Sequence, residues 1–245
     1  MLKLAVIGKD VSGSLSPAMH TFLLGKMGAA CSYEKVSIPP EKFSSRAEEL
    51  FSRFDCFNVT IPFKADIMPC LAQICGDAKA FGAVNTVVSR TRAGYNTDGN
   101  GFMLMLENAG LEPRGKRVLV LGAGGAGRSC IYKLAERGAQ VSVYERSAER
   151  PEQYDIVLNC TGIGMHDTVG KTPSVRTERG EEPVGEELLS QCGAAVDLIY
   201  EPAQSEFLRI AASLGKRTVN GDAMLFYQAY FSDCIYLERT PSAAE

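Results

Sequence analysis

Residues 117–127 read RVLVLGAGGAG, an apolar run that leads into a glycine-rich turn. The run is typical of a buried strand, and the segment that follows the turn, RSCIYKLAER at 128–137, is typical of a helix. A strand, a G-x-G-x-x-G turn and a helix in this order favour dinucleotide binding. The first glycine permits the tight turn, the second lets a pyrophosphate approach the backbone, and the third lets the helix pack against the strand.

We therefore predict that the turn binds the phosphates of a nucleotide at the start of the helix, where free N–H groups and the helix dipole attract anions. The residues concerned are Gly122, Ala123, Gly124, Gly125, Ala126 and Gly127. Glu145 ends the next predicted strand, near the spacing at which an acid binds a ribose diol, which favours NAD. Arg146 and Arg150 follow, and either could pair with the 2′-phosphate of NADP. A solvated turn explains these two arginines equally well.

Strands and helices alternate along most of the chain, which is typical of an α/β fold with parallel sheets. The predicted strands are 3–7, 55–61, 83–89, 117–121, 139–145, 155–160, 194–200 and 218–220. The predicted helices are 17–26, 64–74, 101–110, 128–137, 205–215 and 222–237. The polar stretch 168–185, rich in glycine, proline and charge, is predicted to be a long loop.

Composition excludes several classes of protein. A net charge of -3 gives no basic footprint for nucleic acid and no polybasic patch for a membrane surface. The N-terminal apolar run is too short for a signal peptide, and no apolar run is long enough to span a membrane, so we expect a cytoplasmic protein. The eight cysteines are scattered without a C-x-x-C pair, and only His20 and His166 could join them as ligands, so we expect no metal site.

Polar residues interrupt the first part of the chain in short motifs, each of which has an ordinary structural explanation. In SLSP at 14–17, Ser16 fits a helix N-cap and Pro17 the first helical position, but two hydroxyls there could also hold a carboxylate. In NVTIPFK at 58–64, Asn58 and Thr60 could be turn residues and Lys64 an exposed lysine. Asn85 interrupts an apolar strand in GAVNT, and Asp98 in GYNTDGNG could cap the next helix.

These four motifs, in this order before the GAGGA turn, resemble those of the shikimate/quinate dehydrogenase family. Two later segments agree: DLIYEP at 197–202 resembles the D-x-x-Y-x-P motif of that family, and GDAMLFYQ at 221–228 resembles its G-x-x-M-L-x-x-Q motif. The resemblance covers nearly the whole chain. It implies two α/β domains with a cleft between them. The N-terminal substrate domain would comprise 1–98, completed by the C-terminal helix 222–245, and a Rossmann-type dinucleotide-binding domain would comprise 99–221.

The resemblance also implies an activity, the NADP-dependent, reversible reduction of 3-dehydroshikimate to shikimate, with NAD as an alternative cofactor because of Glu145. Lys64 and Asp98 would flank the carbon that gains or loses hydride. Ser14 and Ser16 would hold the substrate carboxylate, Thr60, Asn85 and Gln228 its hydroxyls, Tyr200 would lie near nicotinamide and substrate, and Gly221 near the cofactor. The partners implied are this small molecule and, at most, a second copy of the chain in a homodimer.

Three other interpretations remain open. The same chemistry on quinate would differ only in pocket shape around the substrate. A folate-linked dehydrogenase of similar two-domain build also uses a lysine, but the Ser14–Ser16 pair argues against it. A nucleotide-sensing module without catalysis is disfavoured because both Lys64 and Asp98 are present.

Overall fold

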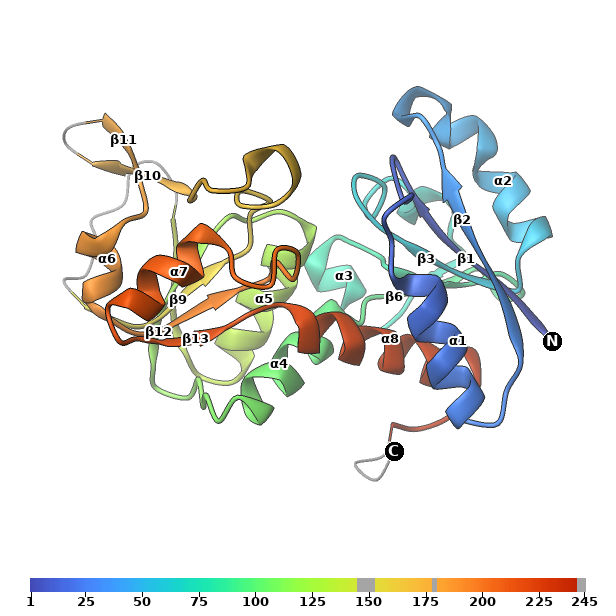
Figure 1. The fold of residues 1–245 in the computed structure, drawn as a ribbon. Coiled ribbons are helices and arrows are strands. Elements are labelled where there is room, and N and C mark those ends of the chain that lie inside the picture. The colour runs from blue at the N-terminus through green and yellow to red at the C-terminus, as the bar shows by residue number, and fades with distance from the viewer. Residues whose placement is uncertain (145–152, 178–179, 242–245) are drawn as a thin grey trace. The chain divides into compact units, whose positions relative to one another are not determined.

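The computed structural model describes residues 1–144, 153–177 and 180–241. The chain forms two compact units (Figure 1). Unit 1 comprises Met1–Gly101 and Phe226–Glu245, and unit 2 comprises Phe102–Leu225. The chain leaves unit 1 within helix α4 (Asp98–Asn108) and returns to it within helix α8 (Asp222–Tyr236).

Unit 1 is built on a six-stranded mixed sheet with the strand order β2-β1-β3-β5-β6-β4. Its strands are β1 (Leu2–Gly8), β2 (Cys31–Ser37), β3 (Cys56–Val59), β4 (Gln73–Ile74), β5 (Thr86–Val88) and β6 (Ala93–Tyr95). Strands β2 and β3 both run parallel to β1, whereas β5 runs antiparallel to β3 and β6.

Helices cover both faces of this sheet. Helices α2 (Phe43–Arg53) and α3 (Ala78–Phe81) pack on the face that carries Ala5 and Ile7. Helix α1 (Ser16–Lys26) and the second half of α8 pack together on the face that carries Leu4. The alternation of buried side chains along β1 therefore supplies two separate cores, as expected for a strand covered on both sides.

Unit 2 contains a five-stranded parallel sheet with the strand order β13-β12-β9-β7-β8. These strands are β7 (Arg117–Leu121), β8 (Gln140–Val143), β9 (Tyr154–Asn159), β12 (Cys192–Asp197) and β13 (Arg217–Val219), and the helices after them include α5 (Gly125–Glu136), α6 (Glu186–Ser190) and α7 (Glu206–Ser213). The chain adds β8 on one side of β7 and β9 on the other. The carboxyl end of β7 is thus a topological switch point, where open α/β sheets bind ligands.

The predicted α/β class is confirmed, but two element predictions were wrong. Residues 64–74 do not form a helix, because Pro69 has no N–H to donate; they form turns, a short 3-10 helix (Met68–Cys70) and strand β4. The predicted loop 168–185 contains an antiparallel hairpin of β10 (Ser174–Thr177) and β11 (Gly180–Pro183). A short 3-10 helix, His166–Thr168, ends at the first residue of the predicted loop.

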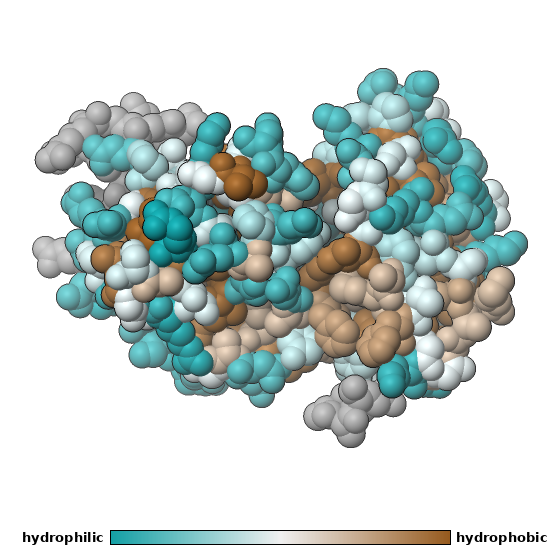
Figure 2. Space-filling view, viewed as in Figure 1, coloured by the Kyte–Doolittle hydropathy of each residue, from teal (hydrophilic) through white to brown (hydrophobic). Residues whose placement is uncertain are grey.

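Hydrophilic residues cover most of the face shown in Figure 2, with apolar residues gathered over α1 and α8. Phe22 of α1 and Leu15, its N-cap residue, are exposed. Of the helices within the described ranges, none combines the length and the apolar character needed to cross a bilayer.

Candidate active site

One edge of the unit 1 sheet collects the polar motifs. Strands β1 and β3 are parallel neighbours, so the segments after them, which carry Ser14 and Thr60, leave the sheet at the same edge. Strand β5 is antiparallel to β3, and its first residue, Thr86, lies opposite Asn58. Asn85 therefore precedes β5 at this edge, and Asp98 follows the end of β6 there. The register thus brings together residues that are up to 84 positions apart in the chain (98 minus 14).

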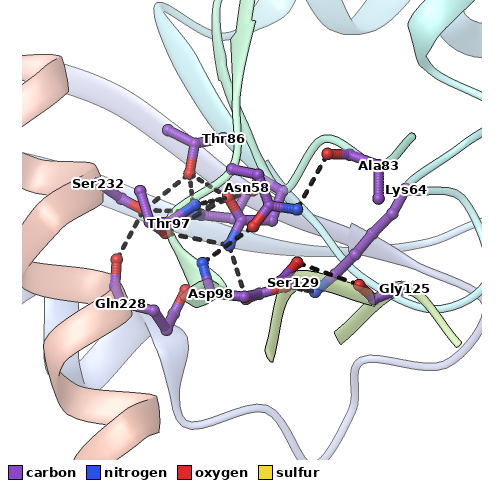
Figure 3. A network of polar contacts seen from close by, with 12 residues as sticks. Asn58, Lys64, Ala83, Thr86, Thr97, Asp98, Gly125, Ser129, Gln228 and Ser232 are labelled. Atoms are coloured by element: carbon purple, nitrogen blue, oxygen red, sulfur yellow. Dashed lines mark hydrogen bonds and ion pairs between the residues drawn. The ribbon is translucent and has the colours of Figure 1, made fainter. Parts of the chain in front are cut away.

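Lys64 and Asp98 form an ion pair at this edge (Figure 3). The distance from Lys64 Nζ to Asp98 Oδ2 is 2.5 Å, and the side chains are 16% and 7% exposed. The other carboxylate oxygen, Oδ1, accepts a hydrogen bond of 2.8 Å from Asn85 Nδ2. Asp98 therefore orients the lysine rather than only starting helix α4, and the ammonium keeps partial access to solvent.

Asn85 is fixed from several sides. Its amide nitrogen donates to Asp98 and, at 3.0 Å, to Thr97 Oγ1, while its amide oxygen accepts from the Thr97 backbone N–H at 3.0 Å and the Thr86 hydroxyl at 2.8 Å. These contacts determine which end of the amide faces the carboxylate. These side-chain partners explain why a polar residue stands in an otherwise apolar stretch of sequence.

A second layer of polar contacts lies beside the ion pair, and its members Ser232, Thr86 and Thr97 were not predicted as site residues from the sequence. Ser232 of α8 approaches the hydroxyls of Thr86 and Thr97 at 2.8 and 3.1 Å, and donates to the carbonyl oxygen of Gln228 at 2.9 Å (Figure 3). Asn58 donates to Ser232 Oγ at 3.3 Å. One signal could have identified Ser232: it lies four residues after Gln228, on the same helical face.

The two serines of the SLSP motif are linked to this layer through Tyr33 of β2. Ser14 Oγ donates to Ser16 Oγ at 3.1 Å. Burial raises the pKa of the Tyr33 hydroxyl, and the side chain of Ser16 beside it lowers that pKa. The Tyr33 hydroxyl donates in turn to Asn58 Oδ1 at 2.7 Å. Helix α1 begins at Ser16 itself, and its N-cap is Leu15, so the expected capping role of Ser16 is wrong. The hydroxyls of both serines are part-buried.

In unit 2 the three glycines of the turn differ in what their surroundings require. Gly122 has φ +93°, and a Cβ there would lie 2.7 Å from Thr161 Cγ2. A Cβ on Gly127 would collide with the carbonyl oxygen of Gly122. A Cβ on Gly124 would meet no atom of the described residues within 4 Å. The fold itself thus requires the first and third glycines, whereas the open space at Gly124, at the N-terminus of α5, fits the close approach of a pyrophosphate.

The segments after β9 and β12 are tied together by Asp197. Its Oδ1 accepts from Asn159 Nδ2 and from the Ile199 backbone N–H, both at 3.0 Å, and its Oδ2 accepts from the Ser205 hydroxyl at 2.5 Å. Burial raises the pKa of the Asp197 carboxyl to about 6, although these three hydrogen bonds lower it. The network fixes both ends of the segment that carries Tyr200.

The predicted site residues divide between the two units. Unit 1 contains Ser14, Ser16, Thr60, Lys64, Asn85, Asp98 and Gln228, and unit 2 contains the glycine turn, Tyr200 and Gly221. Burial raises the pKa of the half-buried Tyr200, with Glu201 and Asp222 adding to the effect. A Cβ on Gly221 would collide with the Leu198 carbonyl oxygen, so close packing explains this glycine. Glu145, Arg146 and Arg150 lie outside the described residues.

Comparison with known proteins gives a consistent result. A family model described as the shikimate dehydrogenase substrate binding domain matches residues 6–87. A shikimate dehydrogenase (NADP(+)) of Thermus thermophilus is 36% identical over 247 residues, which cover 93% of this chain and 89% of the relative. The enzyme of the same name from Caldicellulosiruptor saccharolyticus is 32% identical, with 97% and 93% covered.

Solved structures agree with these relatives. A shikimate 5-dehydrogenase from Thermus thermophilus, in complex with NADP(H) and shikimate, matches with a TM-score of 0.85 and 32% identity and covers 100% of this chain and 96% of that one. Shikimate dehydrogenase 1 from Peptoclostridium difficile matches with a TM-score of 0.87 and 29% identity, with 100% and 94% covered.

Proposed function

The chain belongs to the shikimate dehydrogenase family, and we propose that it catalyses the reversible, NADP-dependent reduction of 3-dehydroshikimate to shikimate. The observation that carries this proposal is the Lys64–Asp98 ion pair, at the same sheet edge as a layer of hydroxyl and amide groups. A hydroxylated, anionic ring needs such an edge, with donors and acceptors for its hydroxyls and one group that can exchange a proton.

In the reducing direction, negative charge develops on the ketone oxygen of the substrate, and this oxygen then takes up a proton. The Lys64 ammonium stabilises that charge and donates the proton. Asp98 holds the ammonium in place, since its second oxygen is fixed by Asn85. In the oxidising direction the lysine amine takes the proton back. The nicotinamide cofactor, when bound, would supply the hydride as NADPH in the reducing direction and accept it as NADP⁺ in the oxidising direction.

The other unit 1 residues hold the substrate. The Ser14 and Ser16 hydroxyls bind its carboxylate, and their linkage through Tyr33 to Asn58 supports this role because it fixes their positions. Thr60, Asn85 and Gln228 bind its hydroxyls. The amide of Gln228 lies on α8, one turn before Ser232.

Unit 2 holds the nucleotide. The turn 122–127 and the N-terminus of α5 bind the pyrophosphate, which the open space at Gly124 supports. Tyr200 lies beside the nicotinamide, in a segment that Asp197 fixes, and Gly221 also borders the cofactor. Arg146 and Arg150 bind the 2′-phosphate. The preference for NADP over NAD is supported by the relatives and by the solved structure that are named with NADP.

The test is a set of initial rates in which shikimate and quinate are crossed with NADP and NAD in one purified preparation. We expect the highest kcat/KM for shikimate with NADP. Turnover of quinate alone would replace the substrate but keep the mechanism, and a preference for NAD would make Glu145 the dominant contact. Nucleotide binding without turnover of any pair would contradict the proposal and favour a sensing module.

We also propose that the protein works in the cytoplasm as a monomer or a homodimer. All eight cysteines are free, which suits a reducing compartment. Cell fractionation and light scattering of the purified protein test the two statements separately.

A further inference from the structure

A second buried pair of ionisable side chains lies in unit 1, apart from Lys64 and Asp98. His20 of α1 and Asp233 of α8 are both fully buried, and His20 Nδ1 lies 2.6 Å from Asp233 Oδ1. The remaining polar atoms, His20 Nε2 and Asp233 Oδ2, are buried without a hydrogen-bond partner within the described residues. Burial raises the pKa of the Asp233 carboxyl despite the nearby imidazole.

A contribution to stability alone does not explain this pair. The surroundings are the apolar contact between α1 and α8, formed by side chains such as Leu23, Met27, Ala229 and Cys234. Removing two ionisable groups from water costs free energy that one hydrogen bond repays only in part, and an apolar pair of similar volume often stabilises as well or better. A position-specific contact between the two helices explains the pair better than a contribution to the core.

Both helices carry groups that hold the substrate in the proposed function. On α1, Ser16 lies four residues before His20 and therefore one turn away on the same face. On α8, Asp233 directly follows Ser232, whose hydroxyl meets Thr86 and Thr97 and the backbone of Gln228. The hydrogen bond between His20 and Asp233 thus joins the two helices close to both sets of groups.

The imidazole ring also supports the link between the serines and the sheet. The rings of His20 and Tyr33 are stacked, with centroids 4.8 Å apart and planes 15° from parallel. Tyr33 is the residue that connects Ser16 with Asn58. Displacing the His20 ring would therefore release Tyr33, and with it the position of the Ser16 hydroxyl.

We propose that His20 and Asp233 are a positioning pair: they set the serine carboxylate site on α1 relative to Gln228 and Ser232 on α8, and thereby substrate affinity, without touching the substrate. This inference rests on the proposed function of unit 1. The pair takes no part in proton transfer, so its loss should change KM for shikimate and leave the chemical step nearly intact.

The experiment compares the wild type with the double variant His20→Leu/Asp233→Ala, which replaces the pair by apolar groups of similar total volume. We expect a folded protein with an unchanged Tm, a KM for shikimate raised about tenfold or more, kcat within about threefold and an unchanged Kd for NADP. Asp233→Asn keeps an oxygen that can accept from Nδ1, and should stay within about threefold of the wild-type KM. Tyr236→Phe is the matched control, because it removes a hydroxyl of the same region that has no partner in the described part of the chain.

A folded double variant with the wild-type KM would overturn the inference. If the double variant does not fold, the single variants Asp233→Asn and His20→Asn test the inference. His20→Asn loses the ring that stacks on Tyr33, so it should raise KM for shikimate, whereas Asp233→Asn should not. Equal KM values for the two variants would overturn the inference. Absence of shikimate turnover in the wild type contradicts the proposed function instead, so the two failures are distinguishable.

Discussion

The candidate site of unit 1 is formed by side chains, whereas that of unit 2 is formed by backbone. In unit 1 the site consists of side chains that hold one another, such as Lys64, Asp98 and Asn85. In unit 2 the turn consists of backbone, and its glycines act through the absence of a side chain. The two sites are therefore sensitive to opposite changes: removing side-chain atoms should damage the site of unit 1, and adding a single methyl group should damage the turn of unit 2.

The largest effect that we expect is on catalysis by unit 1. Lys64→Ala should lower kcat by about 10²–10⁴-fold, because it removes the group that we propose as the proton donor, while KM for shikimate changes little. Steady-state kinetics at saturating NADP measure both parameters. Lys79→Ala, an exposed lysine of α3, is the control and should behave as the wild type. A large rise in KM with unchanged kcat would make Lys64 a binding residue only.

The next effect tests the backbone character of unit 2. Gly127→Ala places a methyl group against the Gly122 carbonyl oxygen and should lower the free energy of unfolding by about 1–3 kcal/mol. Gly124→Ala meets no atom of the described residues, so it should keep the wild-type Tm and weaken NADP binding about tenfold. Thermal unfolding and nucleotide titration separate the two results.

Gly25→Ala is the matched control for this pair, since it adds a methyl group to an exposed position of α1 with no described atom within 4 Å. It should leave both NADP binding and shikimate turnover unchanged. Equal loss of stability in Gly124→Ala and Gly127→Ala would mean that the fold constrains the whole turn, and the open space at Gly124 would then not indicate a ligand.

The two units also differ in the surroundings of a buried carboxylate. Asp98 of unit 1 faces a lysine, whereas Asp197 of unit 2 faces three neutral donors and has a pKa raised to about 6. Because the folded pKa exceeds the ordinary 3.8, this group stabilises the fold at low pH, and the contribution disappears as pH rises through about 6. The free energy of unfolding of the wild type minus that of Asp197→Asn should therefore be about 1 kcal/mol larger at pH 5 than at pH 7.5.

Urea unfolding at both pH values measures this difference. A larger difference at pH 7.5 would mean that the three donors overcome burial and keep the carboxylate charged. The amide that Asp197→Asn introduces can still accept from the Ile199 backbone N–H, so the segment that carries Tyr200 should remain folded.

The backbone turn of unit 2 could be predicted from the sequence more completely than the side-chain site of unit 1, because one depends on local sequence and the other on which elements pack together. Glycine spacing after a strand indicates a backbone turn directly, and the family resemblance of the polar motifs in unit 1 singled out Lys64, Asp98 and Asn85, which the structure brings into contact. Ser232 and Tyr33 were missed because their roles depend on which elements pack together, and neither belongs to a recognised motif. Strand β2 was missed because it is an edge strand with mostly exposed or half-exposed residues, which leaves little apolar pattern. The prediction of a helix at 64–74 was wrong because it followed the apolar pattern and gave too little weight to Pro69, which cannot donate a helical hydrogen bond.

The smallest effect that we expect comes from a single hydroxyl of unit 1. Ser14→Ala should raise KM for shikimate about three- to fivefold, within the net contribution of one ordinary hydrogen bond, without changing kcat or NADP binding. Ser45→Ala, an exposed serine of α2, is the control. The Ser14 variant removes only one member of the linkage through Ser16, Tyr33 and Asn58, so the remaining members should keep their places. A fall in kcat with unchanged KM would contradict a carboxylate site at Ser14, and a loss of NADP affinity would show that the side-chain site of unit 1 and the backbone site of unit 2 do not act separately.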